Sequence, residues 1–303
     1  MVNSIIDGFA SRGTADLVAE FTVKYPFQVI YGQLELPPDE LAAFQKLAVG
    51  LMCIIIDFEH AAEASAKMGE YFAVLLKERR ELGGQGQDLI SLLAVAEVDG
   101  ERLPDSVAIS FLRQLMNAAG DTTYRSTGSL LVGLLTHPEQ LDAVRKDRSL
   151  VPRAVEEALR WDGPLTVLTR QTTRAVTLDG IEIAAGTKID VVQGSANRDP
   201  ARYPNPDSFD VLRPPGRNLA FAYGPHICIG LHLARLEMAR ALNALLDRLP
   251  NLRLDPDYPP PRVVGFNSRT PGRAREIRPQ VRCADEISGS LLETLSKYPF
   301  RAA

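Results

Sequence analysis

Phe221-Ala222-Tyr223-Gly224-Pro225-His226-Ile227-Cys228-Ile229-Gly230 is the stretch of sequence that decides the fold. A single cysteine, Cys228, stands between Gly224 and Gly230. Glycine permits tight turns and a close approach of the backbone to a ligand. From Gly230 to Leu249 apolar residues recur at helical spacing. The pattern predicts a tight loop that presents Cys228 just before the first turn of a helix.

This loop resembles the signature of the cytochrome P450 family, the haem-thiolate monooxygenases. The signature reads Phe-x-x-Gly-x-[His/Arg]-x-Cys-x-Gly, and Phe221, Gly224, His226, Cys228 and Gly230 meet every fixed position. The resemblance implies that Cys228 ligates the iron of haem b, since thiolate electron donation favours O–O cleavage. It implies that His226 binds a haem propionate and that the other three positions shape the loop against the porphyrin. Without the signature, a buried core thiol is the usual role of a lone cysteine.

A long helix is predicted from Leu103 to Thr136, because no proline interrupts the segment after Pro104; about 30 residues would span ~45 Å. Its Ala118-Ala119-Gly120-Asp121-Thr122-Thr123 resembles the family's [Ala/Gly]-Gly-x-[Asp/Glu]-Thr-[Thr/Ser] on the distal side of the haem. The resemblance implies that Ala118 leaves room at the haem and that Asp121 and Thr122 relay protons. The family's usual glycine falls on Ala119. The alternative is a polar notch in a buried helix, with a threonine bonded to the preceding turn.

Glu157 and Arg160 share a face of the helix predicted at Val151–Trp161. An isolated pair at this spacing usually lies on the surface and contributes little. In the family that the chain resembles, it is a buried structural pair completed by a second arginine. Arg213 is the candidate for that arginine, although Ser208 stands where many members carry it.

Arg170 follows this helix at the distance where relatives place an arginine that binds a haem propionate; an exposed strand arginine is the alternative. The sequence around it changes to short apolar runs separated by glycine turns, which predicts strands. These lie at 166–172, 175–178, 181–183 and 188–192. Helices are expected at 41–50, 61–80, 138–147, 151–161 and 230–249. The order indicates a mainly α (α+β) fold, and the resemblance implies a cytochrome P450-like helical fold with small β-sheets.

The resemblance predicts one P450-like domain over residues 1–274, truncated at its N-terminus by about 100 residues relative to the family. Asp7 to Glu20 already resembles the helix that follows this segment in relatives. Residues 275–303 resemble nothing identifiable and are expected to form a separate tail.

Composition limits the partners and the compartment. The 303 residues carry a formal net charge of −4, which gives no electrostatic case for nucleic-acid binding. The longest apolar run, Leu47–Ile56, is too short to span a membrane. Three widely spaced cysteines form no disulfide framework. We therefore expect a cytoplasmic protein.

The function implied by the resemblance is a haem-thiolate monooxygenase that inserts one oxygen atom from O₂ into a small apolar organic substrate. Electrons would come from a separate ferredoxin or flavodoxin-type donor with its reductase. Leu165, Val167, Leu168 and Phe266 are expected to line the substrate pocket. One alternative is a haem-binding remnant with little or no turnover, because the N-terminal part is missing. Another is a helical interaction protein without haem.

Overall fold

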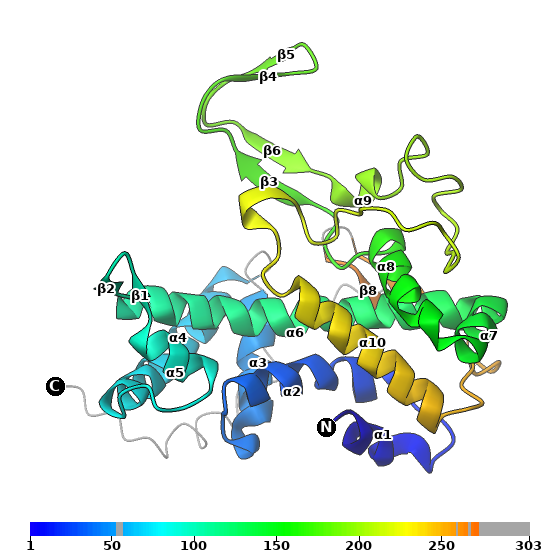
Figure 1. Cartoon of the computed structure of the whole chain (residues 1–303), viewed down its shortest axis with the longest axis horizontal. Coiled ribbons are helices and arrows are strands. Elements are labelled where there is room, and N and C mark those ends of the chain that lie inside the picture. The colour runs from blue at the N-terminus through cyan, green and yellow to red at the C-terminus, as the bar shows by residue number, and fades with distance from the viewer. Residues whose placement is uncertain (53–56, 259, 266–267, 273–303) are drawn as a thin grey trace. The chain divides into compact units, whose positions relative to one another are not determined.

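The computed structural model describes residues 1–52, 57–258, 260–265 and 268–272 (Figure 1). Contacts within the chain divide these residues into two compact units. The first unit comprises Met1–Val23 and the described residues from Thr122 onward, and the second comprises Lys24–Asp121. The prediction of a single domain over 1–274 stays a prediction. None of the described helices combines the length and the apolar character that crossing a membrane requires.

The first unit combines helices with irregular chain and small sheets, in line with the predicted mainly α (α+β) fold. Its elements are α1 (Val2–Ala10), a π-helical turn (Val18–Thr22), the second half of α6 (Asp105–Thr136), α7 (Pro138–Lys146), a 3₁₀ turn (Arg148–Leu150), α8 (Val151–Trp161), the short α9 (Gln193–Ala196), a 3₁₀ turn (Gly224–His226) and α10 (Leu231–Arg248).

The continuous helix expected from Asp7 to Glu20 is wrong. α1 ends at Ala10, and Gly13 takes a φ of +75°, which a right-handed helix does not allow. Helical structure resumes at Val18, whose N–H donates to Asp16 Oδ1 at 3.0 Å. The Asp16 side chain therefore supplies a local turn that interrupts the expected helix.

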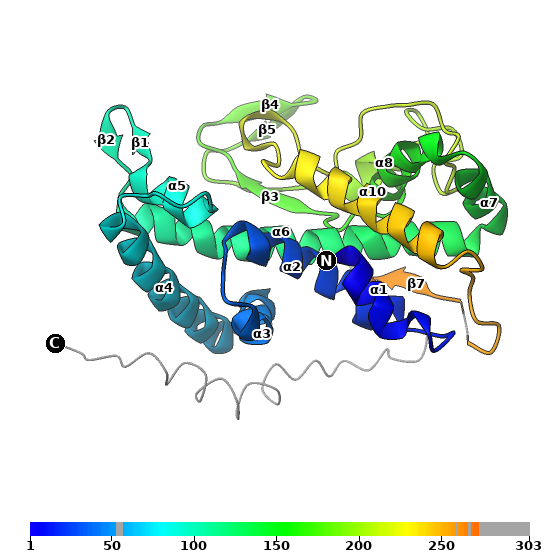
Figure 2. The ribbon, with the colours of Figure 1, turned by 60° about the horizontal axis from the view of Figure 1, so that its bottom comes forward.

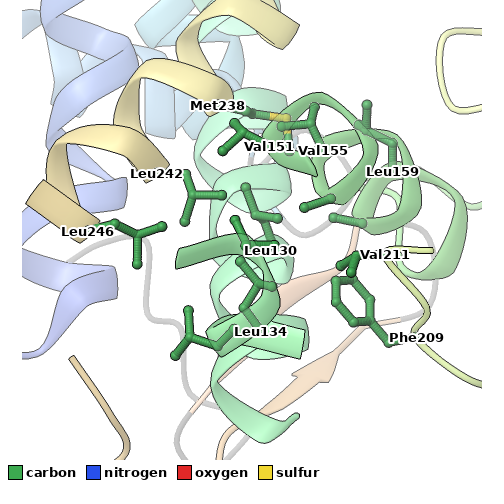
Figure 3. Close-up of a cluster of buried hydrophobic side chains, with 14 residues drawn as sticks. Leu130, Leu134, Val151, Val155, Leu159, Phe209, Val211, Met238, Leu242 and Leu246 are labelled. Carbon is green, nitrogen blue, oxygen red and sulfur yellow. The ribbon is translucent and has the colours of Figure 1, made fainter. Parts of the chain in front are cut away.

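The hydrophobic core of the first unit lies where α6, α8 and α10 meet (Figure 3). Each helix turns the face that carries its apolar residues inward. The labelled members are Leu130 and Leu134 of α6, Val151, Val155 and Leu159 of α8, Met238, Leu242 and Leu246 of α10, and Phe209 and Val211 from the irregular chain. A Cβ on Gly133 of α6 would lie 2.6 Å from the Phe209 ring, so only glycine lets this ring reach the helix.

The four predicted strands are confirmed and form one exposed ribbon of the first unit (Figure 1). β3 (Leu168–Gln171) pairs antiparallel with β6 (Lys188–Val191), and β4 (Val176–Leu178) pairs with β5 (Ile181–Ile183). Asp179 and Gly180 both take positive φ, which suits a two-residue hairpin turn. A further antiparallel pair, β7 (Arg262–Val264) with β8 (Thr270–Gly272), was not predicted.

The second unit is helical apart from one small hairpin. It contains α2 (Lys24–Gln33), a 3₁₀ turn (Pro38–Glu40), α3 (Leu41–Met52), α4 (Phe58–Glu81), α5 (Leu89–Val95), β1 (Glu97–Val98), β2 (Glu101–Arg102) and the first half of α6. α3 packs beside α4 (Figure 2). Phe44 of α3 meets Tyr71 of α4 with ring centroids 4.4 Å apart. A Cβ on Gly120 would lie 2.3 Å from the Phe27 ring, which explains the glycine there by packing.

Glu157 and Arg160 form a buried pair, as the family resemblance predicts. Arg160 donates to both Glu157 carboxylate oxygens at 2.8 Å, and Arg213 Nε donates to both at 3.1 Å. The Asp210 N–H donates to the same carboxylate at 2.9 Å. Arg213 is therefore confirmed as the third member of this ion-pair triad. The remaining N–H groups of Arg160 donate to the carbonyls of Asn197, Pro206 and Ser208.

Glu157→Ala should destabilise the folded chain by about 3–5 kcal/mol, because two guanidinium groups lose their buried counter-charge. Denaturant unfolding of the purified chain measures this. The control is Asp142→Ala, which removes an acid paired with an arginine at the same i, i+3 spacing but 58% exposed; that loss should stay below about 1 kcal/mol. Equal losses for the two variants would contradict the structural role of Glu157.

Glu237 of α10 is a second buried carboxyl, but its surroundings differ. The residue is 5% exposed, and its Oε2 has no hydrogen-bond partner among the described residues. Burial without a compensating partner disfavours the charged form and raises the pKa of Glu237 to about 8. The folded chain therefore holds a proton at neutral pH that the unfolded chain releases.

Because the folded pKa of Glu237 is the higher one, stability should fall as the pH rises from about 4.5 to about 8. Glu237→Gln should remove this dependence. At pH 8 its free energy of unfolding should exceed that of the parent by on the order of 4 kcal/mol, so its denaturant midpoint should be higher. Denaturant midpoints at pH 5, 6, 7 and 8 test this. Glu139→Gln, at an exposed position on α7, is the control and should leave the slope unchanged. A parental slope that persists in Glu237→Gln would refute the assignment.

Candidate functional site

The cysteine loop, residues 221–230, is folded by its own backbone. The Cys228 N–H donates to the Phe221 carbonyl at 3.0 Å, and the Ile227 N–H donates to the Gly224 carbonyl at 3.0 Å. Gly224 takes a φ of +85°, a conformation that favours glycine. These constraints turn Cys228 outward, and its thiol is free and exposed. The interpretation of Cys228 as a buried core thiol is therefore wrong.

The Cys228 sulfur lies beside the start of α10. Gly230 is the N-cap of this helix, and a Cβ added there would lie 3.9 Å from Sγ. The first turn of a helix leaves backbone N–H groups without intrahelical partners and carries a partial positive charge. Both properties suit a negatively charged group bound at this end of the helix.

Exposed side chains with large apolar groups flank Cys228 along the cysteine loop. Tyr223 is 75% exposed, Ile227 49% and Ile229 84%. A sulfur ligand on a loop that exposes apolar side chains fits a flat, apolar metal complex such as haem, which would cover them. His226 is exposed on the same loop, and its role toward a propionate stays a prediction. The residues present thus fit haem, and the three apolar side chains were not singled out from the sequence.

Arg170 lies in the same unit, on β3, opposite Ile189 of β6. It is exposed, and its Nη1 donates to the Thr169 carbonyl at 2.9 Å. This position agrees with the alternative of an exposed strand arginine. Its role toward a propionate stays a prediction.

The residues predicted for the distal side belong to α6. Ala118 is exposed and Asp121 is buried, both in the second unit, whereas Thr122 is half-buried and is the first α6 residue of the first unit. Bonds back to the preceding turn come from Ser126 Oγ, which donates to the Thr122 carbonyl, and from Thr127 Oγ1, which donates to the Thr123 carbonyl, each at 2.8 Å. The roles of Ala118, Asp121 and Thr122 stay predictions.

The segment predicted to line the substrate pocket follows α8. Leu165, Val167 and Leu168 are half-buried, and Leu165 forms an antiparallel bridge with Ser268. Buried Asp162, at the start of this segment, is ion-paired with Arg269. The segment is thus tied to the β7–β8 hairpin. Phe266, also predicted to line the pocket, lies outside the described residues.

Comparison with known proteins identifies the family. The model of the family described as Cytochrome P450 matches residues 51–264. Cytochrome P450 monooxygenase PikC of Streptomyces venezuelae is 37% identical over 281 residues, which cover 88% of this chain and 67% of PikC. Cytochrome P450 107B1 of Saccharopolyspora erythraea is 35% identical over 258 residues, 84% of this chain and 62% of that protein. The chain spans 64% of the length of its Xylella fastidiosa relatives.

Solved structures agree with the sequence relatives. The himastatin post-tailoring hydroxylase HmtN superposes with a TM-score of 0.78 at 35% identity, covering 89% of this chain and 71% of HmtN. P450BioI, solved in complex with an acyl carrier protein ligated to hexadec-9Z-enoic acid, gives a TM-score of 0.82 at 29% identity over 89% of this chain and 70% of that chain. The predicted P450-like fold is confirmed, and with it the family resemblance: the chain belongs to the cytochrome P450 family.

Proposed function

We propose that this chain carries the catalytic machinery of a haem-thiolate monooxygenase, which inserts one oxygen atom from O₂ into a small apolar organic substrate. The observation that carries the proposal is the exposed thiol of Cys228 at the start of α10, on a loop that also exposes Tyr223, Ile227 and Ile229. Haem b is the cofactor of the cytochrome P450 family, to which the chain belongs. When bound, haem supplies the iron at which O₂ is activated.

In this proposal the residues of the chain hold the cofactor and control its environment. Cys228 would provide the sulfur that holds the iron, and the loop backbone would fix its direction through the bond from the Cys228 N–H to the Phe221 carbonyl. Gly224 and Gly230 leave room for the porphyrin beside the loop. His226 and Arg170 bind the propionates by charge-assisted hydrogen bonds.

Asp121 and Thr122 are proposed to move protons. A carboxyl and a hydroxyl on consecutive residues of this helix supply two groups that can each donate or accept a proton on its way to the reacting centre. The burial of Asp121 supports this role, because it keeps the carboxyl largely out of contact with bulk water. The exposed Ala118, one turn earlier, provides a small side chain near this pair.

The substrate and the electron donor are proposed by class. The apolar character of Leu165, Val167 and Leu168 favours an apolar organic molecule. Relatives support this class: one is named steroid C26-monooxygenase, and CYP109E1 was solved in complex with testosterone. A separate ferredoxin or flavodoxin-type donor with its reductase would supply two electrons, one at a time, in the cytoplasm.

Cys228→Ala should abolish the thiolate-type spectrum that the reduced haem protein gives with carbon monoxide, because no sulfur remains at the axial position. Reconstitution with haem, reduction and a difference spectrum measure this. Cys283→Ala is the control, since it removes a cysteine remote in sequence, and should retain the spectrum. A thiolate-type spectrum from Cys228→Ala would contradict the assignment of Cys228 as the sulfur ligand of haem. Product formation with surrogate redox partners then separates turnover from the alternative, haem binding with little or no turnover.

Thr122→Ala should raise the hydrogen peroxide released per NADPH consumed, by roughly tenfold or more, because proton delivery loses its hydroxyl. A surrogate ferredoxin and reductase supply electrons, and peroxide and NADPH are followed together. Thr122→Ser keeps the hydroxyl and should stay near the parent value. Thr127→Ala removes another hydroxyl of the same helix and serves as the control. Unchanged coupling in Thr122→Ala would contradict the relay.

A further inference from the structure

Arg235 of α10 joins three parts of the first unit that are distant in sequence. Its Nε and Nη2 donate to the two carboxylate oxygens of Glu156 on α8, the second at 3.2 Å. Its guanidinium carbon lies 4.6 Å from the centroid of the Phe221 ring. Asn218 Nδ2 also donates to Glu156, at 3.3 Å. We call the set Glu156, Arg235 and Phe221 the clamp.

The geometry of the clamp restricts the position of the Phe221 ring. The ring packs against the hydrophobic core of the first unit. The Arg235 guanidinium also lies over the ring, in the arrangement of a cation–π contact. The two-point contact with Glu156 fixes the plane of the guanidinium, because both partners are planar and forked. The ring is therefore held by contacts with both the packed core and a fixed cation.

The backbone carbonyl of Phe221 accepts the hydrogen bond from the Cys228 N–H at 3.0 Å. A displacement of Phe221 would therefore weaken the bond that closes the cysteine loop. The neighbouring backbone adds to this constraint, since Ala222 takes a φ of +58°, which is unfavourable for a residue with a Cβ. The loop can relax from this conformation unless its first residue is held.

We propose that Arg235, held by Glu156, is a positioning residue that keeps the Phe221 carbonyl on the Cys228 N–H and thereby sets the direction of the Cys228 sulfur. The consequence for haem, that the thiolate stays bound to the iron, rests on the proposed function. Its structural step, the closure of the cysteine loop, depends only on contacts within the first unit.

Amide hydrogen exchange at Cys228 in the haem-free chain tests the structural step. Arg235→Ala should accelerate this exchange by roughly tenfold, the order that the loss of a cation–π contact supports. Arg235→Lys keeps the charge without the planar fork and should give an intermediate rate. The amide of Asp210, which donates to Glu157, reports on folding in the same molecule and should not change. Arg240→Ala, an exposed arginine of the same helix, is the matched control.

The carbon monoxide spectrum of the haem-loaded chain tests the consequence. Arg235→Ala should convert part of the thiolate-type signal to the form without a thiolate ligand, and Glu156→Ala should do the same to a lesser degree. Adding Glu156→Ala to Arg235→Ala should change nothing further, because both act through one contact. Parental exchange or a fully parental spectrum in Arg235→Ala would overturn the proposal. A parent chain without any thiolate-type spectrum would instead overturn the proposed function.

Discussion

Glu157 places a carboxylate in the interior of the first unit, within hydrogen-bond distance of Arg160 and Arg213. Two guanidinium groups and one carboxylate could not share this interior without further partners, since buried charges need full hydrogen bonding. The backbone carbonyls of Asn197, Pro206 and Ser208 supply acceptors for Arg160. The irregular chain between α9 and the cysteine loop therefore obtains its conformation from this charge cluster rather than from regular secondary structure.

Two adjacent residues of α8 connect this helix to two different parts of the first unit. Neighbours on a helix are rotated by about 100°, so Glu156 and Glu157 reach different parts of the unit. Glu157 binds the irregular chain at Asp210 and Arg213, and Glu156 binds α10 at Arg235. The opposite face of α8 packs into the core with Val151, Val155 and Leu159 (Figure 3). One short helix thus fixes both the chain that leads to the cysteine loop and the helix that follows it.

Glu157 and Glu237, two of the buried carboxyls of the first unit, show that burial alone does not define a role. Glu157 is satisfied by two arginines and a backbone N–H. Glu237 has only desolvation acting on it, which raises its pKa to about 8. The first carboxyl supports the fold in its charged form, whereas the second is tolerated in its neutral form. Both lie on helices of one core, and only their partners distinguish them.

The sequence by itself determined the family, the long helix α6, the four-strand ribbon and the spacing of Glu157 and Arg160, because each is written in a local motif or period. The break after α1 was missed, since Gly13 and Asp16 act through backbone geometry that a family resemblance does not display. Only the tertiary structure decided that Cys228 is exposed, and that Arg235 meets Glu156 across 79 residues. Contacts at such separations depend on how the chain folds back on itself. Burial then decides how much the loss of one member of an ion pair lowers the free energy of unfolding. The cost is a few tenths of a kcal/mol for an exposed pair and, as we expect for Glu157, several kcal/mol for a buried one.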